Sequence, residues 1–433
     1  MGRKRHFVPL DVYLNGRQVG QLARAASGAV YFAYGHDWLD WEHSFPVSLS
    51  LPLREGRYSG AVVLAVFDNL LPDYEPIRRR VAERVGAQGA DTYGLLSAIG
   101  RDCVGALQFL PEGEAPQALD RLSGTVLDEA QIAARLRDLD LAPLGLRAES
   151  GFRISIAGAQ EKTALLYQNG QWIEPDGTTP TTHILKPQIG RLPNGMDLSD
   201  SVENEHLCLT LLEAFGLSVA QTRIARFEDQ KVLVVERFDR RWARDGRLLR
   251  LPQEDMCQAL SIPPSRKYQN EGGPGIAEIM ALLRGSDQPL QDRLDFFRAN
   301  VLFWLMGATD GHAKNFSLAL APGGRFRMTP LYDVLSVQPG VDSRQIERKE
   351  FRLAMRWGGS NNYRVQDIVG RHIIETGLAS GLSREMIASL CEELRDRAEG
   401  AIARSYDALP EEVPERILDS IASAMTARLK GLV

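Results

Sequence analysis

Residues Thr309 to Asn315 read T-D-G-H-A-K-N, and they follow the apolar stretch F-F-R-A-N-V-L-F-W-L-M-G-A, residues 296–308. That stretch has the periodicity and composition of a buried helix. Burying Asp310 without a partner beside such a helix would be costly. The segment therefore predicts a tight, glycine-containing turn of functional polar residues at the end of a core helix.

Asp310 and Asn315 have the D-x-x-x-x-N spacing, which lets a carboxylate face an acceptor hydroxyl while an amide oxygen turns to a metal ion. Such a spacing occurs about once by chance in a chain of this length, so its context matters. Asp333 ends the short apolar run P-L-Y-D-V and is suited to bind magnesium, although a cap or turn aspartate is the alternative. Lys314 is a candidate to neutralise phosphate. His312 has no Cys/His cluster around it, which favours a structural or phosphate-facing histidine.

Upstream segments match the other needs of phosphoryl transfer from ATP. The stretch S-I-A-G-A-Q-E-K-T, residues 155–163, has small residues that would let backbone N–H groups approach phosphate, with a plain β-turn as the alternative. Lys186 ends the β-like run T-H-I-L-K and is the candidate cation, although surface lysines are common in such a pattern. Either Glu203 or Glu205 could orient it from the following helix, and this choice stays open.

The run V-L-V-V-E-R-F predicts a buried strand that ends at Glu236 and Phe238, where a kinase would hold adenine with the connection between its lobes; the alternative is a strand that simply ends there. The order of the segments favours a role in phosphoryl transfer over a purely structural role for each segment. Loop, lysine, acidic helix, connector, D-x-x-x-x-N and a last aspartate follow one another with sheet first and helices second. The fold class expected is α+β, a two-lobed protein-kinase-like fold.

Composition sets wider limits on the kind of protein. The chain has 433 residues, 44% of them hydrophobic and 25% charged, which is typical of a globular protein with more than one domain. A net charge of −5 gives no global reason for tight nucleic-acid binding. No apolar run approaches the roughly 20 residues of a membrane span, and the four cysteines form no C-x-x-C pair. We expect a cytoplasmic protein.

Local patterns divide the chain into three parts: 1–112, 113–240 and 241–433. Asn15-Gly16 predicts a hairpin, and Tyr74 to Val85 a helix. Short β-like runs from R-I-S-I at Arg153 onward predict a sheet carrying one helix, with Asp200 and Glu203 as its capping box and Gly216 as its stop. Helical periodicity dominates the last part, and no internal repeat is visible.

The chain resembles the HipA family of serine/threonine kinases, the toxin half of bacterial toxin–antitoxin pairs. The resemblance runs over nearly the whole length. It is carried by F-D-N-L-L-P (67–72), L-L-S-A-I-G-R-D-C-V-G-A-L (95–107), S-I-A-G-A-Q-E-K-T-A-L-L, H-I-L-K-P, E-N-E, V-E-R-F-D-R, T-D-G-H-A-K-N-F-S and L-Y-D-V. The H-R-D and D-F-G motifs of protein kinases at large are missing here, as they are in the family.

The resemblance implies a β-rich N-terminal subdomain, a kinase N-lobe and a helical C-lobe of the PI3/4-kinase-like type. It implies that Asp310 is the catalytic acid/base and that Asn315 and Asp333 bind Mg²⁺. It implies that Ser155 is autophosphorylated and that this expels the phosphate loop and inactivates the kinase. The residues that it implies in ATP contact are Ala157, Gly158, Ala159, Gln160, Glu161, Lys162, Lys186, Glu236, Phe238, His312, Lys314, Asn315 and Asp333.

The resemblance also implies partners. The N-terminal part is that of full-length family members, which suggests a HipB-like helix-turn-helix antitoxin that contacts operator DNA and represses the shared promoter together with the toxin. The family's best-known substrate is glutamyl-tRNA synthetase, and other aminoacyl-tRNA synthetases or translation proteins occur among relatives. Nothing in the sequence selects one substrate.

Two other classes of protein share part of the pattern. A small-molecule phosphotransferase has the same D-x-x-x-x-N spacing, but it needs neither Ser155 in its loop nor the N-terminal subdomain. A non-catalytic co-repressor could hold nucleotide or antitoxin without transferring phosphate, but Asp310, Asn315 and Asp333 would then have no reason to remain together.

Overall fold

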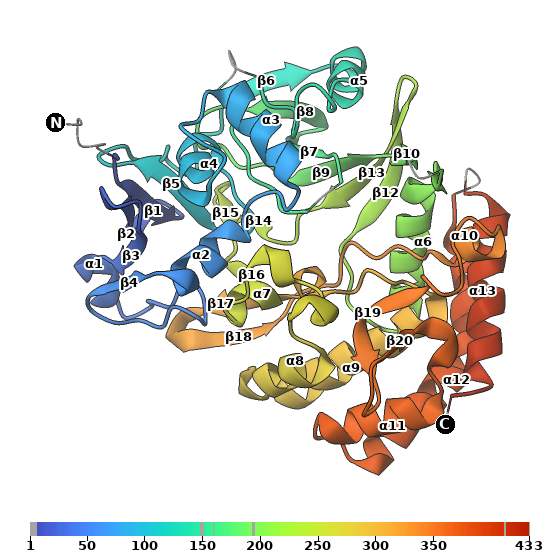
Figure 1. Cartoon of the computed structure of the whole chain (residues 1–433). Coiled ribbons are helices and arrows are strands. Elements are labelled where there is room, and N and C mark those ends of the chain that lie inside the picture. Colours follow the sequence, from blue (N-terminus) through green and yellow to red (C-terminus); the bar gives the residue numbers. More distant parts are fainter. Residues whose placement is uncertain (1–6, 148–150, 159, 193–194, 411–412, 433) are drawn as a thin grey trace. The chain divides into compact units, whose positions relative to one another are not determined.

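The computed structural model describes residues 7–147, 151–158, 160–192, 195–410 and 413–432 (Figure 1). They form two compact units, each assembled from separate stretches of chain. Unit 1 comprises Met1–Pro187, Ala225–Ser265 and Ala319–Arg325, and unit 2 comprises Gln188–Ile224, Arg266–Leu318 and Phe326–Val433. Within the described ranges, no helix has both the length and the apolar character needed to cross a membrane.

Unit 1 begins with a five-stranded antiparallel sheet of order β4-β3-β2-β1-β5. The predicted hairpin is confirmed, because Leu14 pairs with Arg17 and the two turn residues both have positive φ, 47° and 83°. Phe67 packs its ring against Phe32 and Phe109, on two different strands of this sheet. The strands are β1 (Leu10–Leu14), β2 (Arg17–Arg24), β3 (Val30–Tyr34), β4 (Arg57–Ser59) and β5 (Leu107–Pro111).

Four helices accompany this sheet. The helix predicted over Tyr74 to Val85 is confirmed as α3, with a proline in its first turn and left-handed Gly86 after its last residue. The helices are α1 (His36–Leu39), α2 (Ala61–Asp68), α3 (Glu75–Val85) and α4 (Thr92–Ile99). The loop-rich stretch after β5 continues to residue 123, as its composition predicts.

A six-stranded sheet of order β12-β13-β9-β7-β8-β6 is the second large sheet of unit 1, and the last three residues of β12 belong to this unit. Helix α5 (Glu129–Arg137) covers it with Ile132 and Leu136, which pack with buried residues such as Leu165, Leu185 and Val234. The strands are β6 (Gly124–Leu127), β7 (Thr163–Gln168), β8 (Gln171–Pro175), β9 (His183–Pro187), β12 (Thr222–Phe227) and β13 (Gln230–Glu236).

The remaining regular elements of unit 1 are short: β14 (Arg240–Trp242), β15 (Leu248–Arg250), β16 (Gln253–Asp255), α7 (Met256–Ala259) and η1 (Pro264–Arg266), whose last residue belongs to unit 2. Strands β17 (Ser317–Ala321) and β18 (Arg325–Met328) contribute residues to both units.

Unit 2 is mainly helical, as predicted for the second half of the chain. Its helices are α6 (Ser201–Ala214), η2 (Gln269–Glu271), α8 (Ile276–Leu282), η3 (Leu283–Gly285), α9 (Pro289–Met306), η4 (Ala313–Asn315), α10 (Gln338–Asp342), η6 (Val365–Asp367), α11 (Gly370–Ala379), α12 (Arg384–Ala408) and α13 (Glu415–Leu429). Its short strands are β10 (Gly190–Arg191), β11 (Asp197–Leu198), β19 (Arg352–Trp357) and β20 (Asn362–Arg364), and η5 (Pro322–Gly324) lies in unit 1.

Two local predictions are wrong. The R-I-S-I segment from Arg153 is not a strand, because the backbone N–H of Ser155 bonds to Asp102 outside any sheet ladder. Helix α6 begins after Asp200 and stops before Gly216 as predicted, but Asp200 makes no side-chain cap and instead pairs with Arg416. A distant guanidinium therefore replaces the local N–H group as the partner of this carboxylate.

Candidate functional site

The turn predicted after the apolar helix lies directly beyond α9. The residues from Phe296 to Met306 are buried except Arg298, and α9 ends at Gly307, which has φ +71°. A Cβ atom at Gly307 would lie 2.8 Å from the ring of Phe351, so this position requires glycine for space as well as for conformation. The helix therefore stops at a fixed residue and sets the start of the polar turn.

Backbone hydrogen bonds close the turn on itself. The N–H of His312 donates to the carbonyl of Asp310 at 2.8 Å, and the N–H of Asn315 donates to the carbonyl of His312 at 2.9 Å. The side chains of His312 and Asp310 differ in solvent exposure: that of His312 is 5% exposed and that of Asp310 is 59% exposed. The turn thus presents the carboxylate to solvent and keeps the imidazole inside.

Asn315 joins the turn to the segment around Asp333. Its buried side-chain amide nitrogen donates to the carbonyl oxygens of both Asp310 and Asp333, each at 3.0 Å. Asp333 has φ +59°, an uncommon conformation for a residue other than glycine. Because both amide hydrogens are engaged, Asn315 Oδ1 is the atom of this side chain left to act as an acceptor or ligand. The predicted residues Asp310, Asn315 and Asp333 are brought together in unit 2.

Lys314, also predicted, is buried at this turn. Its carbonyl accepts a hydrogen bond from the hydroxyl of Tyr332 at 2.7 Å, and that hydroxyl lies 2.6 Å from Ser317 Oγ. Two neighbouring residues of the L-Y-D-V stretch therefore contact the C-terminal end of the turn, Tyr332 through Lys314 and Asp333 through Asn315.

One contact of Asp310 was missed by the sequence analysis. The hydroxyl of Tyr268 donates to Asp310 Oδ1 at 2.5 Å, and the ring of Tyr268 meets that of His312 edge to face, with 4.9 Å between centroids. The only signal was the glycine-rich stretch K-Y-Q-N-E-G-G-P-G from Lys267, which indicates a constrained loop but no partner.

The predicted phosphate loop belongs to unit 1. The buried Lys162 donates from Nζ to the carbonyl of Ala157 at 2.7 Å, so the loop is closed by its own lysine. Gly158 has φ +107°, and a Cβ atom there would lie 2.5 Å from that Nζ. Gln160 donates to the carbonyl of Pro187 at 3.1 Å. Ala159 lies outside the described residues.

This loop is attached to the N-terminal helices of the same unit. The side chain of Ser155 is fully buried and donates to the carbonyl of Leu70 at 2.7 Å. The N–H of Asp73 donates to the carbonyl of Gly158 at 3.3 Å. Glu161 forms an ion pair of 2.7 Å with Arg80 of α3. The predicted phosphate loop and the F-D-N-L-L-P stretch are therefore one connected structure.

Lys186 and Glu236 lie on paired strands. In the β9–β13 ladder, Leu233 pairs with Lys186 and Glu236 pairs with His183. Lys186 is 6% exposed, whereas Glu236 is exposed at the end of β13, and Phe238 follows two residues later. The strand predicted to end at Glu236 is confirmed. Glu203 and Glu205, both buried, belong to unit 2, so their pairing with Lys186 stays a prediction.

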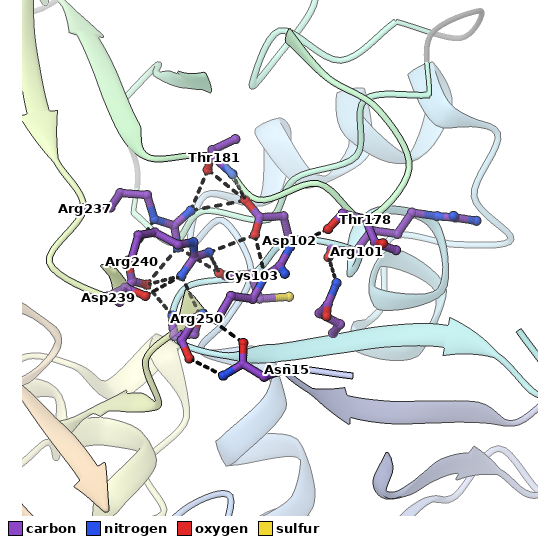
Figure 2. A network of polar contacts seen from close by, with 12 residues as sticks. Asn15, Arg101, Asp102, Cys103, Thr178, Thr181, Arg237, Asp239, Arg240 and Arg250 are labelled. Atoms are coloured by element: carbon purple, nitrogen blue, oxygen red, sulfur yellow. Dashed lines mark hydrogen bonds and ion pairs between the residues drawn. The ribbon is translucent and has the colours of Figure 1, made fainter. Parts of the chain in front are cut away.

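A buried ionic network supports these segments of unit 1 (Figure 2). Asp102 accepts from Arg240 at 2.8 Å and from Arg250 at 3.1 Å, and Arg237 pairs with Asp239 at 2.8 Å. With three arginines and two aspartates, the network carries one more positive than negative charge. It touches both predicted ATP segments, because Arg237 lies between Glu236 and Phe238 and the carbonyl of Asp102 accepts from Ser155.

The network also decides the ionisation of its carboxylates. Burial alone would raise the pKa of Asp102, but Arg240, Arg250 and Arg237 outweigh it and hold that pKa well below its usual range. The pKa of Asp239 is lowered in the same way, with burial opposed by Arg237 and Arg240. Both carboxylates therefore remain charged although they are buried.

The side-chain oxygen atoms near the turn can be compared with the ligands that Mg²⁺ requires. Among the described residues, no group of three or more His, Cys, Asp and Glu side chains is arranged to hold a metal ion. Mg²⁺, however, is usually held by one or two protein oxygen ligands together with phosphate and water. Asn315, with its nitrogen engaged and its Oδ1 left as an acceptor, and Asp333, which is joined to it, fit that need.

Two family models match the chain. The model described as HipA-like C-terminal domain matches residues 154–402, and the model described as HipA N-terminal domain matches residues 10–110. Together they span both the N-terminal helices around Leu70 and the polar turn at Asp310.

Curated relatives and a solved structure agree with these matches. The chain is 37% identical over 401 residues to the putative kinase Y4mE of Sinorhizobium fredii, with 91% of each protein covered. It is 29% identical over 349 residues to the serine/threonine-protein kinase toxin HipA of Shewanella oneidensis, covering 78% of this chain and 77% of that protein. A structure of the Shewanella oneidensis MR-1 HipA, HipB and operator DNA complex matches with a TM-score of 0.81 and 26% identity, over 98% of this chain and 97% of that chain. The α+β, kinase-like fold predicted from the sequence is confirmed by this match.

Proposed function

The chain belongs to the HipA family of kinase toxins, and from that premise we propose that it is an ATP-dependent serine/threonine protein kinase. The single observation that carries the proposal is the Asn315 side chain, whose amide nitrogen bonds to the carbonyls of both Asp310 and Asp333. One side chain thus joins the three residues that phosphoryl transfer needs, an acid and two oxygen ligands.

In this proposal, Asp310 accepts the proton of a serine or threonine hydroxyl as that oxygen attacks the γ-phosphorus of ATP. A new O–P bond forms, the bond from the γ-phosphorus to the bridging oxygen breaks, and ADP leaves. Asn315 and Asp333 would hold Mg²⁺, and the ion would supply positive charge that offsets the charge of the phosphate oxygens. The exposure of Asp310 supports its role, since an acceptor from another protein must reach it.

The phosphate contacts are assigned to the loop from Ala157 to Lys162 and to Lys186, with His312 and Lys314 at the turn. The adenine contacts are assigned to Glu236 and Phe238. The position of Lys186 supports its role, because this buried lysine lies on β9 opposite Leu233 of β13 and is therefore held on a rigid element of unit 1. The functional parts proposed are the N-terminal subdomain, 1–112, the N-lobe, 113–240, and the helical C-lobe, 241–433.

We further propose that Ser155 is the site of inhibitory autophosphorylation. Its hydroxyl is buried and bonded to Leu70, so the segment must leave that place before phosphate can be added. A phosphate carries about −1.5 to −2 charges and could not return to a buried site beside a carbonyl oxygen. The loop would then stay detached from the N-terminal helices.

The partners proposed are a HipB-like antitoxin and, through it, operator DNA, because the matching Shewanella oneidensis structure is a complex of HipA with HipB and its operator DNA. The net charge of −5 supports a partner that supplies most of the DNA contacts. The protein substrate proposed is glutamyl-tRNA synthetase or another aminoacyl-tRNA synthetase, and the compartment proposed is the cytoplasm.

The test is incubation of the purified protein with ATP and Mg²⁺ beside Asp310→Ala, followed by phosphopeptide mapping. Phosphate on Ser155 in the wild type alone is expected. ATP bound but not consumed, with no phosphate on any residue, would overturn the kinase and favour a non-catalytic co-repressor. ATP consumption only after addition of a small acceptor would favour a small-molecule phosphotransferase.

A further inference from the structure

Tyr268 contacts the carboxylate of Asp310 directly. Its hydroxyl donates to Oδ1 at 2.5 Å, while the other oxygen, Oδ2, lies 3.9 Å from Nε2 of His312. A hydrogen bond to an ionised acceptor is short and about twice as strong as a neutral one. One of the two carboxylate oxygens is therefore held, and Oδ2 is the oxygen left to meet another group.

The ring of Tyr268 is constrained as well as its hydroxyl. It meets the His312 ring at an interplanar angle of 82°, in the edge-to-face geometry that aromatic pairs prefer. The carbonyl of the preceding residue, Lys267, accepts from the N–H of Ala313 at 3.4 Å. The Tyr268 segment thus touches the turn through a hydroxyl, a ring and a backbone group.

The loop that carries Tyr268 is itself tightly folded. The carbonyl of Tyr268 accepts from the N–H groups of Glu271 and Gly273, at 3.1 and 2.9 Å. A Cβ atom at Gly273 would lie 2.2 Å from the carbonyl oxygen of Arg266, so only glycine fits there. Gln269 then accepts at 2.8 Å from the N–H of Arg356 in β19. The side chain of Tyr268 therefore projects from an anchored loop.

We propose that Tyr268 is a positioning residue for phosphoryl transfer, which holds Asp310 so that Oδ2 faces the acceptor hydroxyl. The proposal rests on the function assigned to Asp310 above. A carboxylate with 59% exposure on a surface turn would otherwise rotate freely among its rotamers. Restricting the base to one orientation is how an enzyme raises the fraction of productive encounters.

The hydrogen bond between Tyr268 and Asp310 would also be compatible with the opposite role, in which Tyr268 inhibits the kinase. A tyrosine hydroxyl beside the base could occupy the place of the acceptor hydroxyl and so inhibit transfer. The two roles predict opposite changes in rate when the hydroxyl is removed, and this allows a direct test.

The experiment compares wild type, Tyr268→Phe, Asp310→Ala and a matched control, Tyr406→Phe. The control also removes a tyrosine hydroxyl that donates to a carboxylate, that of Asp419. This hydrogen bond joins α12 to α13 and does not involve the turn at Asp310. Steady-state rates with ATP, Mg²⁺ and a protein acceptor are measured beside the dissociation constant of a fluorescent ATP analogue. Tyr268→Phe keeps the ring against His312, and unchanged nucleotide affinity shows that unit 2 remains folded.

We expect kcat of Tyr268→Phe to fall about 10-fold or more, with the nucleotide dissociation constant and the rate of Tyr406→Phe unchanged. An unchanged kcat, a raised kcat, or an equal loss of nucleotide affinity would each overturn the positioning role. Full activity in Asp310→Ala would instead overturn the proposed function. The two failures are thus distinguished in one set of measurements.

Discussion

The Ser155 hydroxyl donates a hydrogen bond of 2.7 Å to the carbonyl of Leu70, a residue 85 positions earlier in the chain. The side chain of Ser155 is fully buried there, and its N–H donates to the carbonyl of Asp102. The segment next to the predicted phosphate loop is therefore held by two stretches of the N-terminal subdomain. A negative charge at Ser155 should therefore break the attachment of this segment to the N-terminal subdomain.

Replacing Ser155 by aspartate should detach the segment, because a carboxylate would be buried against the carbonyl oxygen of Leu70 without a cation. Hydrogen exchange of the amides of residues 153–158 should rise, and affinity for ATP should fall about 10-fold or more. Ser155→Ala is the control: it loses one hydrogen bond, costs about 1 kcal/mol and keeps ATP affinity. Equal exchange in the two variants would contradict the prediction.

Arg80 and Glu161 should contribute to nucleotide binding through their ion pair. Arg80→Glu or Glu161→Arg alone should weaken ATP binding about 2- to 5-fold, the range of partly exposed pairs, and the double swap should recover part of it. Arg79→Glu on the same helix is the matched control, since Arg79 forms an exposed ion pair with Glu75. Isothermal titration with ATP measures all four variants. Additive losses in the double swap would show that the pair does not position the loop.

Asp102→Asn should destabilise unit 1 strongly. The asparagine keeps the shape, but it removes the carboxylate that Arg240 and Arg250 both contact, and removal of one partner of a buried pair costs about 3–5 kcal/mol. Asp245→Asn, which removes an exposed ion pair with Arg247, should change stability by less than about 1 kcal/mol. Urea unfolding followed by far-UV circular dichroism compares the two. A loss at Asp102 no larger than at Asp245 would count against the network.

Glu254 should make unit 1 less stable at high pH. Burial raises the pKa of Glu254 to about 8 from 4.5, although the backbone N–H of Leu49 donates to it at 2.9 Å. The folded state keeps a proton that the unfolded state releases, so this stability is complete below the unfolded value and lost as pH rises toward the folded one.

The test of this prediction is Glu254→Gln, which is uncharged at every pH. Between pH 5 and pH 8, wild-type stability should fall relative to Glu254→Gln by up to about 1.4 kcal/mol per pH unit. Thermal unfolding at several pH values measures the difference. Parallel pH profiles for the two proteins would show that Glu254 ionises normally in the folded state.

Local chemistry in the sequence was enough to predict several elements. Asn15-Gly16 accept the positive φ angles of a hairpin, α9 has the apolar stretch of a core helix, and β13 ends at Glu236 as its apolar run indicates. These features depend on neighbours a few residues apart, which periodicity and turn chemistry describe. The order of segments, together with the resemblance, was also enough to predict the family and the kinase-like fold.

Only the tertiary structure decided which distant groups meet. Tyr268 reaches Asp310 across 42 residues, Leu70 accepts from Ser155 across 85, and Arg250 reaches Asp102 across 148. The two wrong predictions have the same origin, since Ser155 and Asp200 bond to distant groups instead of to local ones. A buried polar or charged group needs a hydrogen-bond or ion-pair partner, and the nearby sequence shows only that such a partner is required. Which residue becomes that partner is determined by the packing of the whole unit.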